Sequence, residues 1–130
     1  MDRLAEQASL PVDVDAHPLV RTAVAMQPVL RRFREEIERE QRLPPPLVAE
    51  LREAGFYRMV IPQSLGGLEL NPLVYLRAVE VLAEAVGSVG WNLSNGGVGQ
   101  LVTLGLPEEG VEEIYPPGHN TVLNPSKNSR

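Results

Sequence analysis

Hydrophobic and polar residues follow a helical period along most of this chain, most clearly in the first forty residues. Apolar residues recur there at spacings of three and four, which places them on one helix face. These residues are Leu19, Ala23, Met26, Leu30, Phe33 and Ile37. Arginines and glutamates pair at i,i+4 on the opposite side. The pattern predicts a long helix with Pro18 in its first turn, one face buried and the other in solvent.

The three prolines at 44–46 end this helix and open a second one. Leu47, Val48 and Leu51 form its expected inner side, and Gly55 follows where a left-handed cap belongs. Residues 56–61 form a short apolar segment closed by Pro62. This segment fits an extended connector or a brief strand, and we favour the connector because no partner strand is evident.

Two further long helices are expected after a turn at residues 64–67. Asn71 and Pro72 read as the N-cap and first residue of the third helix. Its predicted apolar face comprises Leu73, Leu76, Val79, Leu82, Ala83 and Val86. Gly87 is expected to end it, and Ser88 to cap a fourth helix that continues to about residue 104. A short fifth helix is expected over 107–116. Together these elements predict an all-α fold, a bundle of four or five helices with short connections.

The chain of 130 residues has room for one domain of ordinary size. Residues 1–16 show no helical or strand period and are expected to be a flexible leader. The helical domain then covers 17–118. The last twelve residues, 119–130, hold three of the six asparagines and no acid. We expect an irregular tail there, outside the core.

Composition excludes several classes of function. With a net charge of −5, the chain lacks the basic stripe that nucleic-acid binding needs, so no nucleic-acid partner is expected. The absence of cysteine excludes disulfides, thiolate metal sites and thiol nucleophiles. His17 and His119 lie near opposite ends of the chain, so neither a metal site nor a serine hydrolase triad is expected. No catalytic residue can be named.

A membrane span is also not expected. Residues 85–107 carry no charge and are long enough to cross a bilayer. However, they contain six polar side chains and six glycines, which favours a buried helix of a soluble protein. The first fifteen residues contain no apolar run of a secretory signal, and a cytoplasmic location is the expectation.

The glycine-rich residues 87–99 contain the candidate pocket residues. They match no phosphate-binding motif, and no strand precedes them. Because glycine destabilises a helix, the three glycines within 96–99 indicate that another helix or a flat ligand approaches closely. Trp91 and Asn95 share a helix face, and an aromatic ring beside an amide suits a pocket for a planar ligand. Trp91 also fits a core position. The candidate substrate-pocket residues are therefore Trp91, Asn95 and Gly96.

The order of motifs resembles the N-terminal helical domain of the acyl-CoA dehydrogenase-like flavoproteins. Residues 43–59 resemble that family's second helix, and residues 60–70 resemble its turn with two adjacent glycines after a proline. Residues 79–83 and 87–91 complete the series, so the resemblance covers about residues 19–118. It implies an oxidoreductase in which this domain forms one wall of the substrate and flavin pocket. Flavin, as FAD or FMN, would be held mostly by later domains, and this chain alone is expected to be a truncated form without bound flavin or turnover.

The resemblance leaves two activities open. Dehydrogenase members act on an acyl thioester. A second branch uses reduced flavin and oxygen to hydroxylate an aromatic small molecule, and relies on a separate flavin reductase. Residues 87–91 and the segment around Arg58 are slightly closer to that monooxygenase branch. Its members often carry a histidine a few residues after the tryptophan, where this chain has Asn95, Gly96 and Gly97.

Other functions remain open beside the resemblance. A homo-oligomer is expected. A non-enzymatic helical module could bind a partner through the face that further domains would cover. An independent carrier of a small ligand is supported only by Trp91 and the glycines.

Overall fold

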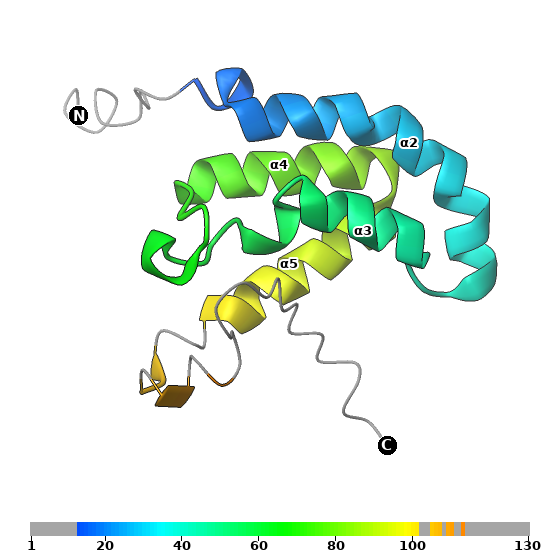
Figure 1. The fold of residues 1–130 in the computed structure, drawn as a ribbon. Coiled ribbons are helices and arrows are strands. Elements are labelled where there is room, and N and C mark those ends of the chain that lie inside the picture. The colour runs from blue at the N-terminus through cyan, green and yellow to red at the C-terminus, as the bar shows by residue number, and fades with distance from the viewer. Residues whose placement is uncertain (1–12, 102–104, 108, 111–112, 114–130) are drawn as a thin grey trace, which may run out of the picture.

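The computed structural model describes residues 13–101, 105–107, 109–110 and 113, and in these residues the chain is all-α (Figure 1). Over residues 13–101, four α-helices and three short 3-10 helices follow one another. They are η1 (Val14–Ala16), α2 (Pro18–Glu40), α3 (Pro45–Glu53), η2 (Phe56–Arg58), η3 (Gln63–Leu65), α4 (Pro72–Ala85) and α5 (Gly87–Leu101). The described residues contain no β-strand. The prediction of a four- or five-helix all-α bundle is confirmed.

The long helix α2 begins and ends where local chemistry favours it. His17 caps its start, where the Nδ1 atom accepts a hydrogen bond from the Leu19 N–H at 3.1 Å. Gln41 ends it in a left-handed conformation with φ 53°. The predicted apolar stripe is buried except for Phe33, which is half-buried. The helix continues through Pro28.

The segment after α3 differs from the expected extended connector. Gly55 is left-handed with φ 95°, as predicted, but residues 56–58 then form the 3-10 helix η2. The backbone folds back on itself here, because the N–H groups of residues 68 and 70 donate to the carbonyls of Arg58 and Met59 at 2.9 Å. Gly67 lies so close to the Ile61 backbone that a Cβ would overlap it. A glycine is therefore required at this turn.

Helix α4 is the central helix and packs against both α2 and α5 (Figure 1). Asn71 caps it as predicted, since its Oδ1 accepts from the Leu73 N–H at 2.9 Å. The predicted apolar face was wrong in part. The residues actually buried are Val74, Ala78, Val81, Leu82 and Ala85. Leu76 is instead 58% exposed. The error arises because the charged residues of α4 mark one side only and apolar residues occupy the rest of its circumference, so sequence periodicity alone does not single out the buried face.

The connection between α4 and α5 is a single residue, Val86. Gly87 opens α5 and does not end α4 as expected, and Ser88 lies in the first turn. Gly90 brings the two helices together, because a Cβ there would overlap the Ala83 side chain and come within 3.4 Å of the Val79 carbonyl oxygen. Helix α5 is described to Leu101. Of the predicted fifth helix, residues 109–110 and 113 are helical, Pro107 is not, and the remaining positions lie outside the described residues.

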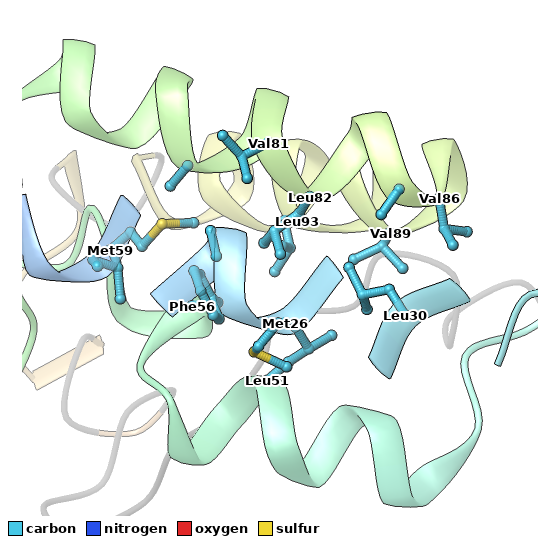
Figure 2. Packing of buried hydrophobic residues seen from close by; sticks show 14 of the residues in the cluster. Met26, Leu30, Leu51, Phe56, Met59, Val81, Leu82, Val86, Val89 and Leu93 are labelled. Carbon is cyan, nitrogen blue, oxygen red and sulfur yellow. The ribbon is translucent and has the colours of Figure 1, made fainter. Parts of the chain in front are cut away.

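The core is aliphatic and lies between the four helices (Figure 2). Phe56 is its one large aromatic side chain that is fully buried. Figure 2 shows Phe56 beside Met59 and close to Leu51 from α3 and Met26 from α2. In the part of the chain that the structure describes, no helix is long and apolar enough to cross a membrane.

The last residues of the predicted leader, 13–16, are structured. Asp13 caps η1, and the Asp15 carboxylate pairs with the Arg77 guanidinium of α4 at 2.8 Å. Arg77 also reaches Glu80 at 2.8 Å. Residues 1–12 of the leader and the predicted tail at 119–130 lie outside the described residues.

Candidate functional site

A shallow hollow lies where η2, α4 and α5 meet, and we call it the Tyr75 hollow. It is lined by residues 56–57 and 59–60, by Tyr75 of α4, and by Leu93, Gly96 and Gly97 of α5. It opens to solvent, and the empty space of about 190 Å³ in it includes part of that open solvent. Three of its lining residues, Phe56, Met59 and Leu93, belong to the hydrophobic core, where Figure 2 labels them. The hollow is therefore mostly apolar, and its polar groups come from two tyrosines.

The Tyr57 hydroxyl is fully engaged inside the protein. The side chain is buried, and its O–H donates to the Asn92 Oδ1 atom of α5 at 3.0 Å. Burial raises the pKa of Tyr57 above its ordinary value, and the Arg52 guanidinium offsets part of this rise. Tyr57 therefore stays a neutral hydrogen-bond donor at physiological pH and ties η2 to α5.

The Tyr75 hydroxyl is held more weakly. It lies 3.5 Å from the Ser94 carbonyl oxygen of α5, at the outer limit of a hydrogen bond. The side chain is half-buried. Burial raises the pKa of Tyr75, while the hydrogen bond to Ser94 acts in the opposite direction. Like Tyr57, this phenol is neutral at physiological pH.

Gly97 makes room for the Tyr75 ring. A Cβ on Gly97 would lie 2.5 Å from the Tyr75 hydroxyl oxygen and 3.0 Å from Cζ. Any larger residue at this position would push the phenol away from α5. The glycine is explained by this close approach of a side chain from α4.

Gly96 differs, because no packing explains it. It is buried and lines the hollow, yet a Cβ on it would meet no atom within 4 Å. Alanine would be more favourable in this helix by up to ~1 kcal/mol. Gly96 therefore leaves open space beside the hollow at a cost in helix stability.

The structure does not bring the three predicted pocket residues together. Gly96 lines the Tyr75 hollow, whereas Trp91 is 72% exposed and Asn95 is also exposed. At 3.6 residues per turn, Trp91 and Gly96 are about 140° apart around α5. Trp91 is thus not the core anchor that was one of its two interpretations. That Trp91 and Asn95 line a pocket stays a prediction.

Sequence reasoning missed Tyr57, Tyr75 and Gly97 as site residues. Tyr75 lies in the apolar run of α4 and Tyr57 follows Gly55, so neither stands out by spacing. Gly97 was noted as one of a glycine group, which did signal a close approach to the helix. The sequence did not reveal that Gly97 makes room for the Tyr75 ring, whereas Gly96 has open space at its Cβ position.

The described residues do not form a metal site. No group of three His, Cys, Asp or Glu side chains lies close enough there to hold an ion. The hollow itself offers hydroxyls, aromatic edges and open space beside a glycine. These features suit an apolar, flat molecule with few polar atoms.

Residues 18–113 match the family model of the acyl-CoA dehydrogenase N-terminal domain. The chain belongs to this family. The match covers all four α-helices and confirms the resemblance drawn from the sequence motifs.

Two relatives of this chain are monooxygenases by name. The chain is 38% identical over 91 residues to the oxygenase subunit HsaA of a flavin-dependent monooxygenase from Rhodococcus jostii, which covers 70% of this chain and 24% of that protein. It is 34% identical over 77 residues to indole-3-acetate monooxygenase from Acinetobacter baumannii, covering 59% of this chain and 20% of the relative. The chain thus spans about a quarter of the length of the curated relatives it matches.

Solved structures agree with this family assignment. The 3-HSA hydroxylase from Rhodococcus sp. RHA1 superposes with a TM-score of 0.78 at 30% identity, over 83% of this chain and 28% of that one. The HsaA monooxygenase from M. tuberculosis gives a TM-score of 0.74 at 27% identity, over 84% of this chain and 29% of that one. The acyl-CoA dehydrogenase N-terminal domain fold therefore extends across the described helices.

Proposed function

We propose that this chain is the N-terminal helical domain of a flavin-dependent monooxygenase, and that the Tyr75 hollow is one wall of its aromatic-substrate pocket. The observation that carries the proposal is Gly96, a buried helical glycine beside open space. Its conformational cost is explained by a ligand that needs the room. The similarity to proteins named as monooxygenases supports the reaction class.

The lining of the hollow favours an aromatic ligand. Tyr75 contributes a half-buried ring that a ligand can reach, and the buried side chains of Phe56, Tyr57, Met59 and Leu93 form an apolar layer behind it. Aromatic rings pack well against such a surface in edge-to-face or offset geometry. The hollow is a shallow depression that encloses no room for a ligand by itself, so the other walls would come from another part of the complete protein.

Flavin does not fit the Tyr75 hollow by itself. The hollow is too shallow for a three-ring isoalloxazine, and none of the described residues that line it is a cation that could meet a phosphate. Flavin, whether FAD or FMN, would be bound by the complete protein and not by this hollow alone. Within the proposal, a flavin reductase supplies reduced flavin, the complete protein is a cytoplasmic homo-oligomer, and this chain alone is inactive.

The exposed residues Trp91 and Asn95 are also part of the proposal. Helix α5 carries no charged side chain from end to end, and these two residues lie on its solvent side. A large exposed aromatic on an uncharged helix face favours contact with another surface. We propose that Trp91 and Asn95 face a part of the pocket formed with the rest of the complete protein.

Binding of small probes to the chain tests the proposal and distinguishes a monooxygenase from a dehydrogenase. Indole and a short acyl thioester are titrated separately into the ¹⁵N-labelled chain, and amide shifts are followed by NMR. A monooxygenase wall predicts that indole shifts the amides of Gly96 and Gly97, and that the thioester shifts them less. A dehydrogenase wall predicts the reverse order. If neither probe shifts these amides up to its solubility limit, the hollow is not a ligand wall.

A further inference from the structure

The two hydroxyls of the Tyr75 hollow differ in how well they are satisfied. The Tyr57 O–H donates at 3.0 Å to a side-chain oxygen that lies within the protein. The Tyr75 O–H reaches only the Ser94 carbonyl oxygen, at 3.5 Å. Hydroxyl donors prefer acceptors at about 2.7–2.8 Å, so the second bond is weak. Of the two tyrosines, Tyr75 is therefore the one whose donor a better acceptor would attract.

Gly96 and Gly97 determine where a ligand atom that accepts a hydrogen bond from Tyr75 would lie. Gly97 allows the Tyr75 ring to rest directly on α5, with the hydroxyl oxygen at the helix surface. Gly96 is the adjacent residue, is buried, and has no atom within 4 Å of a Cβ position. The hydroxyl and the open space thus lie side by side on the wall of one hollow.

Resting on the proposed function, we propose that Tyr75 determines specificity by donating a hydrogen bond to an acceptor atom on the rim of an aromatic ligand that occupies the space beside Gly96. The ligand class is a flat ring with an oxygen or nitrogen acceptor at its edge. A hydrocarbon ring of the same shape fills the same space without this bond. The hydroxyl leaves its weak contact with Ser94 and gains a shorter one, so no buried donor is lost on binding.

The donor role is consistent with the environment of the phenol. Burial keeps the pKa of Tyr75 above its ordinary value, so the group carries its proton at neutral pH. The half-buried position allows a ligand to reach it from solvent. An exchange of acceptors requires only rotation of the O–H bond and a small shift of the ring.

An isosteric pair of probes tests the inference. Pyridine and benzene have the same shape, but only pyridine carries an acceptor, and both are titrated into the labelled chain at a pH where pyridine is neutral. The Tyr75→Phe variant should bind pyridine roughly three- to tenfold more weakly than the unaltered chain, with benzene affinity unchanged. The Tyr57→Phe variant, which loses a hydroxyl already bound to Asn92, should change pyridine affinity less.

A second readout does not depend on any variant. With ¹³C-labelled tyrosine, pyridine should shift the Tyr75 Cζ signal of the unaltered chain more than benzene does. Equal affinity of Tyr75→Phe and the unaltered chain for pyridine, or equal Cζ shifts with both probes, would overturn the role of Tyr75 while leaving the proposed pocket wall intact. If neither probe shifts the Gly96 amide, the proposed pocket wall fails together with this inference.

Discussion

Gly90 of α5 lies against Ala83 of α4 so closely that a Cβ on Gly90 would overlap the Ala83 side chain and lie 3.1 Å from its Cα. This contact sets the distance between two helices that both line the Tyr75 hollow. The glycine is needed for packing, because the Cβ and Cα atoms of Ala83 are fixed by the backbone and cannot rotate away. Gly96, six residues later in the same helix, has no such neighbour.

The two glycines therefore predict opposite responses to the same substitution. Gly90→Ala should lower the free energy of unfolding by about 2 kcal/mol, because α4 and α5 must move apart. Gly96→Ala should raise it by up to ~1 kcal/mol, since helix propensity improves and the space is open. Urea denaturation of both variants and the unaltered chain gives the comparison. Equal losses in the two variants would show that the space beside Gly96 is not open.

Titration of the two tyrosines gives a pH dependence with a definite sign. Burial raises the pKa of Tyr57 and of Tyr75 in the folded chain, so the unfolded chain loses these protons first. Their contribution to stability is complete below about pH 10 and is lost as the pH rises from that value through the folded pKa values. Denaturation at a series of alkaline pH values should show this fall. In the double variant Tyr57→Phe, Tyr75→Phe the slope should be shallower, and an unchanged slope would contradict the assignment.

The pair formed by Asp15 and Arg77 predicts a local effect. It joins residues 62 positions apart and holds η1 against α4. Arg77→Gln should increase amide hydrogen exchange at Ala16 and His17, with little change in the midpoint of urea unfolding, because exposed ion pairs contribute little to global stability. Arg34→Gln, which removes the exposed pair of Arg34 with Glu38, is the matched control. Faster exchange at Ala16 in both variants alike would argue against a tether through Arg77.

Much of the fold could be predicted from periodicity and capping residues. The stripe of α2 is unambiguous because charged residues occupy its other side, and Asn71 and Gly55 mark helix ends by their own backbone chemistry. The buried face of α4 could not be predicted, since apolar residues occupy all of that helix outside one charged side and only tertiary contacts select Val74 over Leu76. The prediction of an extended connector over residues 56–61 was wrong for a similar reason. Hydrogen bonds from residues 68–70 determine the backbone there, and these bonds are not local in sequence.

The candidate site was predicted only in outline. A glycine group signals that something approaches a helix, but sequence does not distinguish a side chain, as at Gly97, from open space, as at Gly96. Trp91 and Asn95 do share a helix face, as their spacing implies. That this face is turned away from the core depends on how α5 packs on α4, which involves Gly90 and Ala83.

The most direct test of the central claim compares one substitution at two glycines of α5. Gly96 and Gly99 both have open space at the Cβ position, but only Gly96 lines the Tyr75 hollow. Indole affinity is measured by NMR titration of the Gly96→Leu and Gly99→Leu variants and of the unaltered chain. If the hollow is a wall of an aromatic-substrate pocket, Gly96→Leu abolishes the indole-induced shifts of the Gly97 amide and Gly99→Leu preserves them. Unchanged indole binding in Gly96→Leu would contradict the claim.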